Sequence, residues 1–239
     1  MKKGVFTIAL CCISILVCYI FNFANQRNIN KKISDVEVKI IENTRGVISE
    51  ASVRKIISKN FEKDFENKIK DLNLKDIESN IKASGYVRDV EVATKVNGVL
   101  YVELTPKVPK ARVLEKKDFY LDKNGYKLPL SNDLSARVPV LYNFKKNSHR
   151  DDIALILQKI EEHPFLLNNI IAIRCLKTKT YVLEFRYKDF DIFLGNTKEI
   201  DLKINNLKAF LLLLDNQKKI GEYKRINLEV TNQVIATKK

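Results

Sequence analysis

The residue types that perform acid–base or nucleophilic chemistry are sparse in this chain and do not converge. Two histidines occur, His149 at the start of a predicted helix and His163 near its end, and we interpret each as structural or solvated. The sequence contains no G-x-S-x-G, no H-E-x-x-H and no glycine-rich phosphate loop. Carboxylates are plentiful but lie on charged faces, as Glu161 and Glu162 do. The sequence therefore predicts no catalytic residue and no enzyme.

Cysteine usage predicts neither a disulfide nor a metal centre. Cys11, Cys12 and Cys18 share one apolar stretch near the N-terminus, which leaves Cys175 alone in the body of the protein. No C-x-x-C pair and no Cys/His spacing typical of a metal site is present. Cys175 lies in an apolar run, where a free cysteine usually behaves as a small buried hydrophobe. We expect no metal, no cofactor and no small-molecule substrate.

The stretch of residues 4–23 contains no charged residue and predicts a transmembrane helix. Its length matches the ~20 apolar residues that an α-helix needs to cross the hydrocarbon core of a bilayer. A cleaved signal peptide fits less well, because Phe21 and Phe23 are too bulky for a cleavage site. A lipoprotein signal is disfavoured because Val17, rather than a small residue, precedes Cys18. We interpret the stretch as an uncleaved anchor in the lipid bilayer.

The charges beside this stretch leave its orientation open. Lys2 and Lys3 argue for an N-terminus inside the cell, but Arg27, Lys31 and Lys32 lie close behind the span. We favour residues 1–3 as a short cytoplasmic tail, 24–34 as a juxtamembrane linker, and a body outside the cytoplasm.

A formal net charge of +14 would suggest nucleic acid binding in a cytosolic protein. Here the lysines are scattered beside Glu and Asp instead of forming one basic run. A basic surface next to anionic lipid headgroups explains the charge without a specific ligand. We expect no nucleic acid partner.

The roughly 215 residues behind the span suffice for one large or two small domains.

Residues 35–106 have the pattern of a compact α+β unit in the order strand, helix, helix, strand, strand, with two helices on one face of a small sheet. A further apolar series, Phe61, Phe65 and Ile69, extends the first helix or forms an ordered loop. The other signals are alternation over Val36–Ile40, helix caps at Ser49 and Asn73, a helix end at Gly85, a hairpin turn at Asn97-Gly98 and a strand end at Pro106.

Residues 77–111 resemble the POTRA domain, a polypeptide-transport-associated module. The resemblance lies in the Tyr86-Val87 step, the Val-x-Val strand, the hairpin, and the exit through Thr105-Pro106-x-x-Pro109-x-Ala111. It implies a POTRA-like domain over residues 35–106.

Residues 107–239 read as a mostly antiparallel β domain with two helices. Ser148 and Asp151 have the spacing of a capping box that starts the first helix, and residues 199–214 carry the apolar stripe of the second. The predicted strands are 119–121, 127–130, 138–141, 170–176, 181–187, 190–194, 225–230 and 233–237.

The order of anchor, POTRA-like unit and β domain resembles the FtsQ/DivIB family of bacterial cell-division proteins. The residues that carry this resemblance are Leu121–Gly125, Val138–Leu141, Leu194-Gly195 followed by Lys203 and Leu207, and Ile226–Val234.

The resemblance implies a non-enzymatic, single-pass scaffold of the division septum in the cytoplasmic (inner) membrane, with its body in the periplasm. Its expected partners are coiled-coil membrane proteins of the FtsB and FtsL type, which it links to septal cell-wall synthesis. In the family a partner strand joins the C-terminal edge of the β domain, because such an edge presents unpaired N–H and C=O groups. The matching positions here are Glu229, Val230 and Asn232 on the penultimate strand, and Val230 stands where the family has an aromatic residue.

Two other interpretations stay open from the sequence. A POTRA protein of an export or assembly system would continue into a membrane barrel of many alternating strands, before which this sequence ends. The other is a generic anchored periplasmic module, for example one that binds the cell wall.

Overall fold

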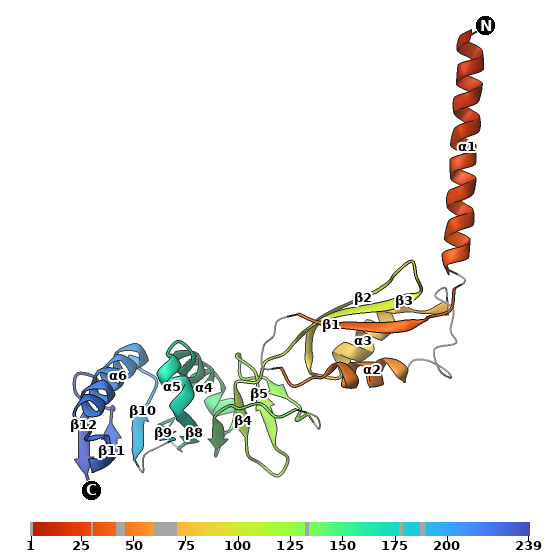
Figure 1. The fold of residues 1–239 in the computed structure, drawn as a ribbon. Coiled ribbons are helices and arrows are strands. Elements are labelled where there is room, and N and C mark those ends of the chain that lie inside the picture. The colour runs from red at the N-terminus through yellow and green to blue at the C-terminus, as the bar shows by residue number, and fades with distance from the viewer. Residues whose placement is uncertain are drawn as a thin grey trace. The chain divides into compact units, whose positions relative to one another are not determined.

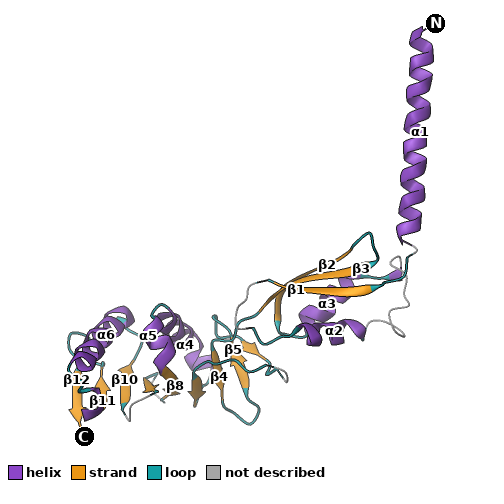
Figure 2. Ribbon diagram, viewed as in Figure 1, coloured by secondary structure: helices purple, strands orange, loops and turns teal. Residues whose placement is uncertain are grey.

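The structure, a computed structural model, describes residues 2–29, 31–41, 46–59, 71–131, 134–176, 179–186 and 190–239. This part of the chain is mixed α+β, with six α-helices and two sheets (Figures 1 and 2), which confirms the α+β part of the predicted fold class. It divides into an N-terminal unit, Met1–Asn43 with Ile48–Pro106, and a C-terminal unit, Thr44–Val47 with Lys107–Lys239.

Helix α1 occupies Lys2–Ile29 and contains the stretch predicted to span a membrane. From Leu10 to Phe23 its side chains are exposed, apolar ones included. Over the residues that the structure describes, no helix combines the length and the apolar character that crossing a bilayer requires. The structure therefore does not support the transmembrane prediction for residues 4–23.

The N-terminal unit contains a three-stranded sheet with two helices on one face (Figure 1). The strand order is β1-β3-β2, in which β1 is parallel and β2 antiparallel to the central β3. The predicted series Phe61, Phe65 and Ile69 lies outside the described residues. The elements are β1 (Asp35–Ile40), α2 (Glu50–Ser58), α3 (Leu74–Ala83), β2 (Val87–Thr94) and β3 (Val99–Pro106).

The hairpin between β2 and β3 turns at Asn97 and Gly98, as the sequence predicts. Gly98 has a φ of +89°, which favours glycine, and a Cβ atom there would lie 3.0 Å from the carbonyl oxygen of Lys32. The turn brings the apolar faces of both strands onto the helices. The core of the unit includes Val36, Val53, Ile57, Ile77, Ile81, Val90, Leu100, Val102 and Leu104.

The C-terminal unit contains one nine-stranded sheet in the order β12-β11-β10-β9-β8-β7-β4-β5-β6. The helices α4 (Lys146–Glu161), α5 (Pro164–Asn169) and α6 (Ile200–Asn216) lie on one face of this sheet (Figure 2). The strands are β4 (Ala111–Val113), β5 (Phe119–Leu121), β6 (Lys127–Leu128), β7 (Val140–Tyr142), β8 (Ile170–Cys175), β9 (Tyr181–Phe185), β10 (Asp191–Gly195), β11 (Tyr223–Asn227) and β12 (Ile235–Lys238).

Three pairings in this sheet are parallel, which the sequence analysis did not predict: β4 with β7, β7 with β8, and β10 with β11. Two of them follow from the helices, because parallel neighbours need a crossover and a helix usually provides it. Helices α4 (Lys146–Glu161) and α5 (Pro164–Asn169) connect β7 to β8, and α6 (Ile200–Asn216) connects β10 to β11. A short 3-10 helix, Ile220–Glu222, precedes β11.

The prediction of two helices in this unit is wrong by one, since α5 was missed. Pro164 stands at its first position and His163 at its N-cap, so the proline that ends α4 also begins the next helix. The capping box is also wrong. Helix α4 begins at Lys146, and Ser148 lies inside its first turn.

Helix α6 confirms its predicted apolar stripe and holds the C-terminal part of the sheet. Its inner side chains lie in one buried cluster with residues of β8 to β11, among them Ile173, Leu183, Ile192 and Ile226. The buried α6 residues of this stripe are Ile200, Ile204, Leu207, Leu211 and Leu214.

The two helix caps of the N-terminal unit give a first testable prediction. Ser49 Oγ accepts a hydrogen bond of 3.2 Å from the Ser52 N–H, whereas Asn73 makes no side-chain cap bond. We expect Ser49→Ala to lower the free energy of unfolding by about 1 kcal/mol and Asn73→Ala to lower it much less. Urea unfolding followed by circular dichroism measures both, and equal losses would contradict the assignment.

Candidate partner-binding edge

The three residues predicted to contact a partner do not lie on the penultimate strand. β11 ends at Asn227 and β12 begins at Ile235. Glu229, Val230 and Asn232 therefore lie in the connecting segment 228–234, which we call the C-terminal loop. The predicted strand limits 225–230 and 233–237 are corrected accordingly.

The chain leaves the strand ladder here because its donors find local acceptors. The Glu229 N–H donates to the side-chain oxygen of Asn227 at 2.8 Å, an Asx turn. The Gln233 N–H then donates to the Val230 carbonyl oxygen at 3.3 Å and closes a turn. The three predicted residues are consequently brought together on one exposed loop, with Val230 47% exposed.

The C-terminal loop rests against the end of β10. The Leu228 N–H donates to the Phe193 carbonyl oxygen at 2.9 Å. The next contact is at Gly195, where a Cβ atom would lie 3.4–3.5 Å from the Cα, Cβ and Cγ atoms of Glu229. Gly195 also has a φ of +69°, so glycine suits both the backbone conformation and the close approach.

A buried lysine on α6 holds the turn that contains Gly195. Lys203 is only 2% exposed, and its Nζ donates to the carbonyl oxygens of Leu194 (3.1 Å) and Asn196 (2.9 Å) and to Asn196 Oδ1 (3.3 Å). Burial lowers the pKa of Lys203, and the negative charge of Glu229 acts in the opposite direction. Lys203 thus holds the backbone of the turn on which Glu229 packs.

Helix α6 also contacts the far side of the loop. Asn206 Nδ2 donates to the Thr231 carbonyl oxygen at 2.8 Å. Asn206 lies one turn beyond Lys203 and is half-buried, whereas the neighbouring Asn205 is exposed. Helix α6 thus contacts the loop near its tip through Asn206, while Lys203 holds the turn on which the base of the loop rests.

Strand β12 forms one end of the nine-stranded sheet, and β11 is its one partner strand among the described residues. The Lys239 N–H donates back to the Glu222 carbonyl oxygen at 2.9 Å. Backbone groups point to alternate sides along a strand, so the amides of Thr237 and Ile235 face β11 as well. The amides of Ala236 and Lys238 then face away from the sheet, toward the side where another strand could pair.

The other edge strands differ from β12 either because they are shorter or because side-chain carboxylates accept hydrogen bonds from their backbone N–H groups. On β1 the Val36 N–H donates to the Asp35 carboxylate at 2.7 Å, and on β2 the Val92 N–H donates to Glu78 of α3 at 3.1 Å. Strand β6, the opposite end of the large sheet, is two residues long. Natural proteins blunt sheet edges by such means. Strand β12, with four residues, is therefore the longer end of the large sheet.

The two histidines and Cys175, whose side chains could take part in acid–base or nucleophilic chemistry, make contacts within the fold. His149 is 4% exposed, and its Nδ1 accepts a 3.0 Å bond from the Lys145 N–H at the N-cap of α4. His163 Nδ1 lies 3.2 Å from Lys208 Nζ. Cys175 is buried, as predicted, and burial raises the pKa of its thiol to about 12.

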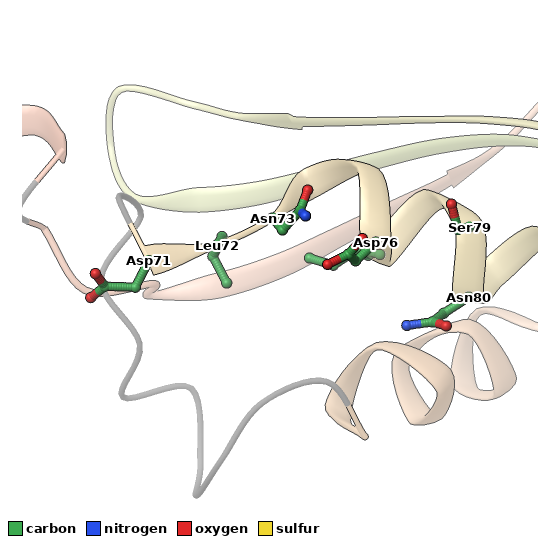
Figure 3. Close-up of a pocket in the computed structure, with 7 residues that line it drawn as sticks. Asp71, Leu72, Asn73, Asp76, Ser79 and Asn80 are labelled. Atoms are coloured by element: carbon green, nitrogen blue, oxygen red, sulfur yellow. The ribbon is translucent and has the colours of Figure 1, made fainter.

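A pocket of about 400 Å³ in the N-terminal unit lies at the start of α3 (Figure 3). Asp71 and Leu72 line it from the segment before the helix, and Asp76 and Asn80 line it from successive turns. Figure 3 shows the carboxylates of Asp71 and Asp76 well apart, so they do not form a pair for acid–base chemistry. Across the described ranges, no group of three or more His, Cys, Asp or Glu residues is placed to hold a metal ion.

Comparison with known proteins accounts for this architecture. Residues 108–237 match the family model described as FtsQ/DivIB, C-terminal related, and so cover the nine-stranded sheet and its helices almost completely. The chain belongs to the FtsQ/DivIB family. This confirms the resemblance found in the sequence.

A relative supports the same family over a longer stretch. The chain is similar to the cell division protein DivIB of Clostridium tetani (strain Massachusetts / E88), with 25% identity over 232 residues. The match covers 89% of this chain and 78% of the relative. The likeness to an FtsQ/DivIB protein thus extends well beyond residues 108–237.

Lys203 and Asn206, which hold the turn and the loop, were not predicted as site residues from the sequence. Lys203 was named only among the residues that carry the family resemblance. One signal was present: Lys203 falls on the buried stripe of α6, beside Ile200, Ile204 and Leu207. A lysine on an apolar stripe is seldom fully buried unless its ammonium group is hydrogen-bonded.

The burial of His149 predicts a pH-dependent stability. Burial lowers its pKa from the ordinary 6.5, so the folded state favours the neutral ring. Below pH 6.5 the unfolded chain takes up the proton first, and stability is lost as the pH falls through the lowered pKa. We expect the free energy of unfolding to fall between pH 7 and 5.5, by up to about 1.4 kcal/mol per pH unit for one proton.

Matched histidine variants test this assignment. His149→Asn removes the titrating ring and is expected to flatten the pH dependence, measured by urea unfolding at each pH. His163→Asn is the control and is expected to retain it. The same slope in both variants and in the parent chain would contradict a role for His149.

Proposed function

We propose that this protein is a non-enzymatic scaffold of the bacterial division machinery that recruits a partner through β12. Membership of the FtsQ/DivIB family and the similarity to a cell division protein support the cellular role. The observation that carries the mechanism is the position of β12 at the end of the sheet, with the amides of Ala236 and Lys238 facing outward.

The partner adds a strand to β12 and not to the penultimate strand, because β11 already lies between β10 and β12. Backbone hydrogen bonds supply affinity in this mode, and side chains near the strand supply specificity. Glu229, Val230 and Asn232 contact the partner from the C-terminal loop. The partners are of the FtsB and FtsL type, coiled-coil membrane proteins that the scaffold links to septal cell-wall synthesis.

The N-terminal unit serves as a POTRA domain in this proposal. Its order of strand, helix, helix, strand, strand supports this, as does its three-stranded sheet with two helices on one face. Residues 35–106 form this domain and residues 107–239 form the β domain.

Residues 4–23 anchor the scaffold in the cytoplasmic membrane, with residues 1–3 inside and residues 24–34 as the linker to a periplasmic body at the septum. This part of the proposal rests on the uncharged sequence of the stretch.

A proline substitution tests strand addition. Ala236→Pro removes one outward N–H, and proline is tolerated on an edge strand whose N–H faces away from the sheet. We expect at least tenfold weaker binding of the FtsB-type protein from the same organism, measured with both proteins purified in detergent. The reason is that an added strand loses a backbone hydrogen bond and meets the proline ring.

The matched control is Ala236→Ser, which keeps the amide and a small side chain and is expected to bind like the parent chain. Thermal unfolding must show that the proline variant is folded. A folded Ala236→Pro variant that binds with unchanged affinity would exclude strand addition at β12. Truncation before Arg225 is a poorer test, because it also removes the buried residues Ile226 and Leu228.

The cellular role has its own test. Depletion of the protein in its host is expected to produce filamentous or undivided cells, observed by microscopy with membrane staining. Normal division after depletion would favour a POTRA protein of export or assembly, or a generic anchored module.

A further inference from the structure

The turn between β10 and α6 is held from two helices by polar side chains. The ammonium group of Lys203, on α6, donates hydrogen bonds to the carbonyl oxygens of Leu194 and Asn196. Asp152 of α4 accepts hydrogen bonds from Thr197 Oγ1 at 2.9 Å and from Tyr181 of β9 at 2.7 Å. Lys203 is buried and Asp152 and Thr197 are half-buried, and hydrogen bonds between such groups favour one local arrangement of the backbone. We call this turn the platform.

The C-terminal loop takes its position from this platform. Glu229 packs on Gly195, which lies between the two carbonyl groups that Lys203 binds. The base of the loop is thus set by contacts that β11 and β12 do not make.

The tip of the loop has a second, independent attachment. Asn206 Nδ2 donates to the Thr231 carbonyl oxygen at 2.8 Å, beside the turn that the Val230 carbonyl oxygen closes with the Gln233 N–H. Val230, 47% exposed, is presented between the two attachments.

We infer that Lys203 and Asn206 are positioning residues that preorganise the C-terminal loop for the partner. This inference rests on the proposed function, because the loop is taken to contact the partner that pairs with β12. A loop that is already ordered loses less conformational entropy on binding, so its attachments increase affinity without touching the partner. Neither residue need contact the partner directly.

An isosteric substitution separates the attachment from the fold. Asn206→Asp removes the donor to Thr231 and keeps the size of the side chain. Asn205→Asp, the matched control, introduces the same charge one residue earlier at an exposed position. Both are made in the full chain, together with Lys203→Met, in which the buried ammonium is replaced by an apolar group.

The first measurement is amide hydrogen exchange of the C-terminal loop without any partner. In Asn206→Asp we expect faster exchange at the amides of Glu229 and Gln233, with exchange in the strands β8 to β10 unchanged. Asn205→Asp is expected to exchange like the parent chain. Equal exchange of the loop in all chains would overturn the positioning role of Asn206.

The second measurement is affinity for the purified FtsB-type protein of the same organism. We expect binding roughly 2- to 10-fold weaker for Asn206→Asp, the range for one net hydrogen bond, and unchanged for Asn205→Asp. If Ala236→Pro loses binding while Asn206→Asp loosens the loop without weakening binding, the inference fails and the proposed function stands. If neither variant changes binding, the proposed function fails, whatever the exchange shows. If Lys203→Met folds, we expect faster amide exchange at Glu229 in this variant. If it does not fold, the exchange and binding of Asn206→Asp decide the test.

Discussion

Backbone hydrogen bonding at the end of the nine-stranded sheet is the constraint on which the rest of this structure depends. An edge strand pairs on one side only, and an open edge is a template for another chain. In the N-terminal unit, carboxylates from Asp35 and Glu78 occupy backbone donors of the two edge strands. At β12 the geometry instead leaves alternate amides directed outward. A sheet that ends in this way suits a protein whose role is to bind another chain.

The crossover helix α6 buries part of the core and also makes polar contacts with the backbone of the turn and the loop. Helix α6 connects β10 to β11 in parallel, so it crosses the sheet above the strands that carry the edge. From this position it buries Ile204 and Leu207 in the core and directs Lys203 and Asn206 to the backbone of the turn and the loop. One helix thus contributes both to the core of the sheet and to the hydrogen bonds of the C-terminal loop.

The polar groups near this edge are engaged in hydrogen bonds with the backbone. Lys203 donates to three acceptors, which holds the backbone of the turn that contains Gly195. The histidines have structural partners, and the Cys175 thiol is buried. In a member of the FtsQ/DivIB family, these contacts are best understood as supports of a recognition surface.

Local chemistry along the chain determined much of the fold. Asn97-Gly98 required a tight turn because glycine alone adopts positive φ without cost, and the 3.6-residue spacing of α6 required one buried face. The alternation in β1 and β3 placed their core residues, and the ordered motifs identified the family. The tertiary structure alone decided the parallel pairings, the end of β11 at Asn227 and the burial of Lys203. These features depend on neighbours distant in sequence. Alternation shows that a strand exists but not which strand lies beside it. A strand ends where its backbone N–H groups bond to other acceptors, as the Glu229 N–H does to the Asn227 side chain. The residues of the candidate site were therefore predicted from the sequence. Their place in a loop, and the contacts of Lys203 and Asn206 that hold the turn and the loop, followed only from the packing of α6 on the sheet.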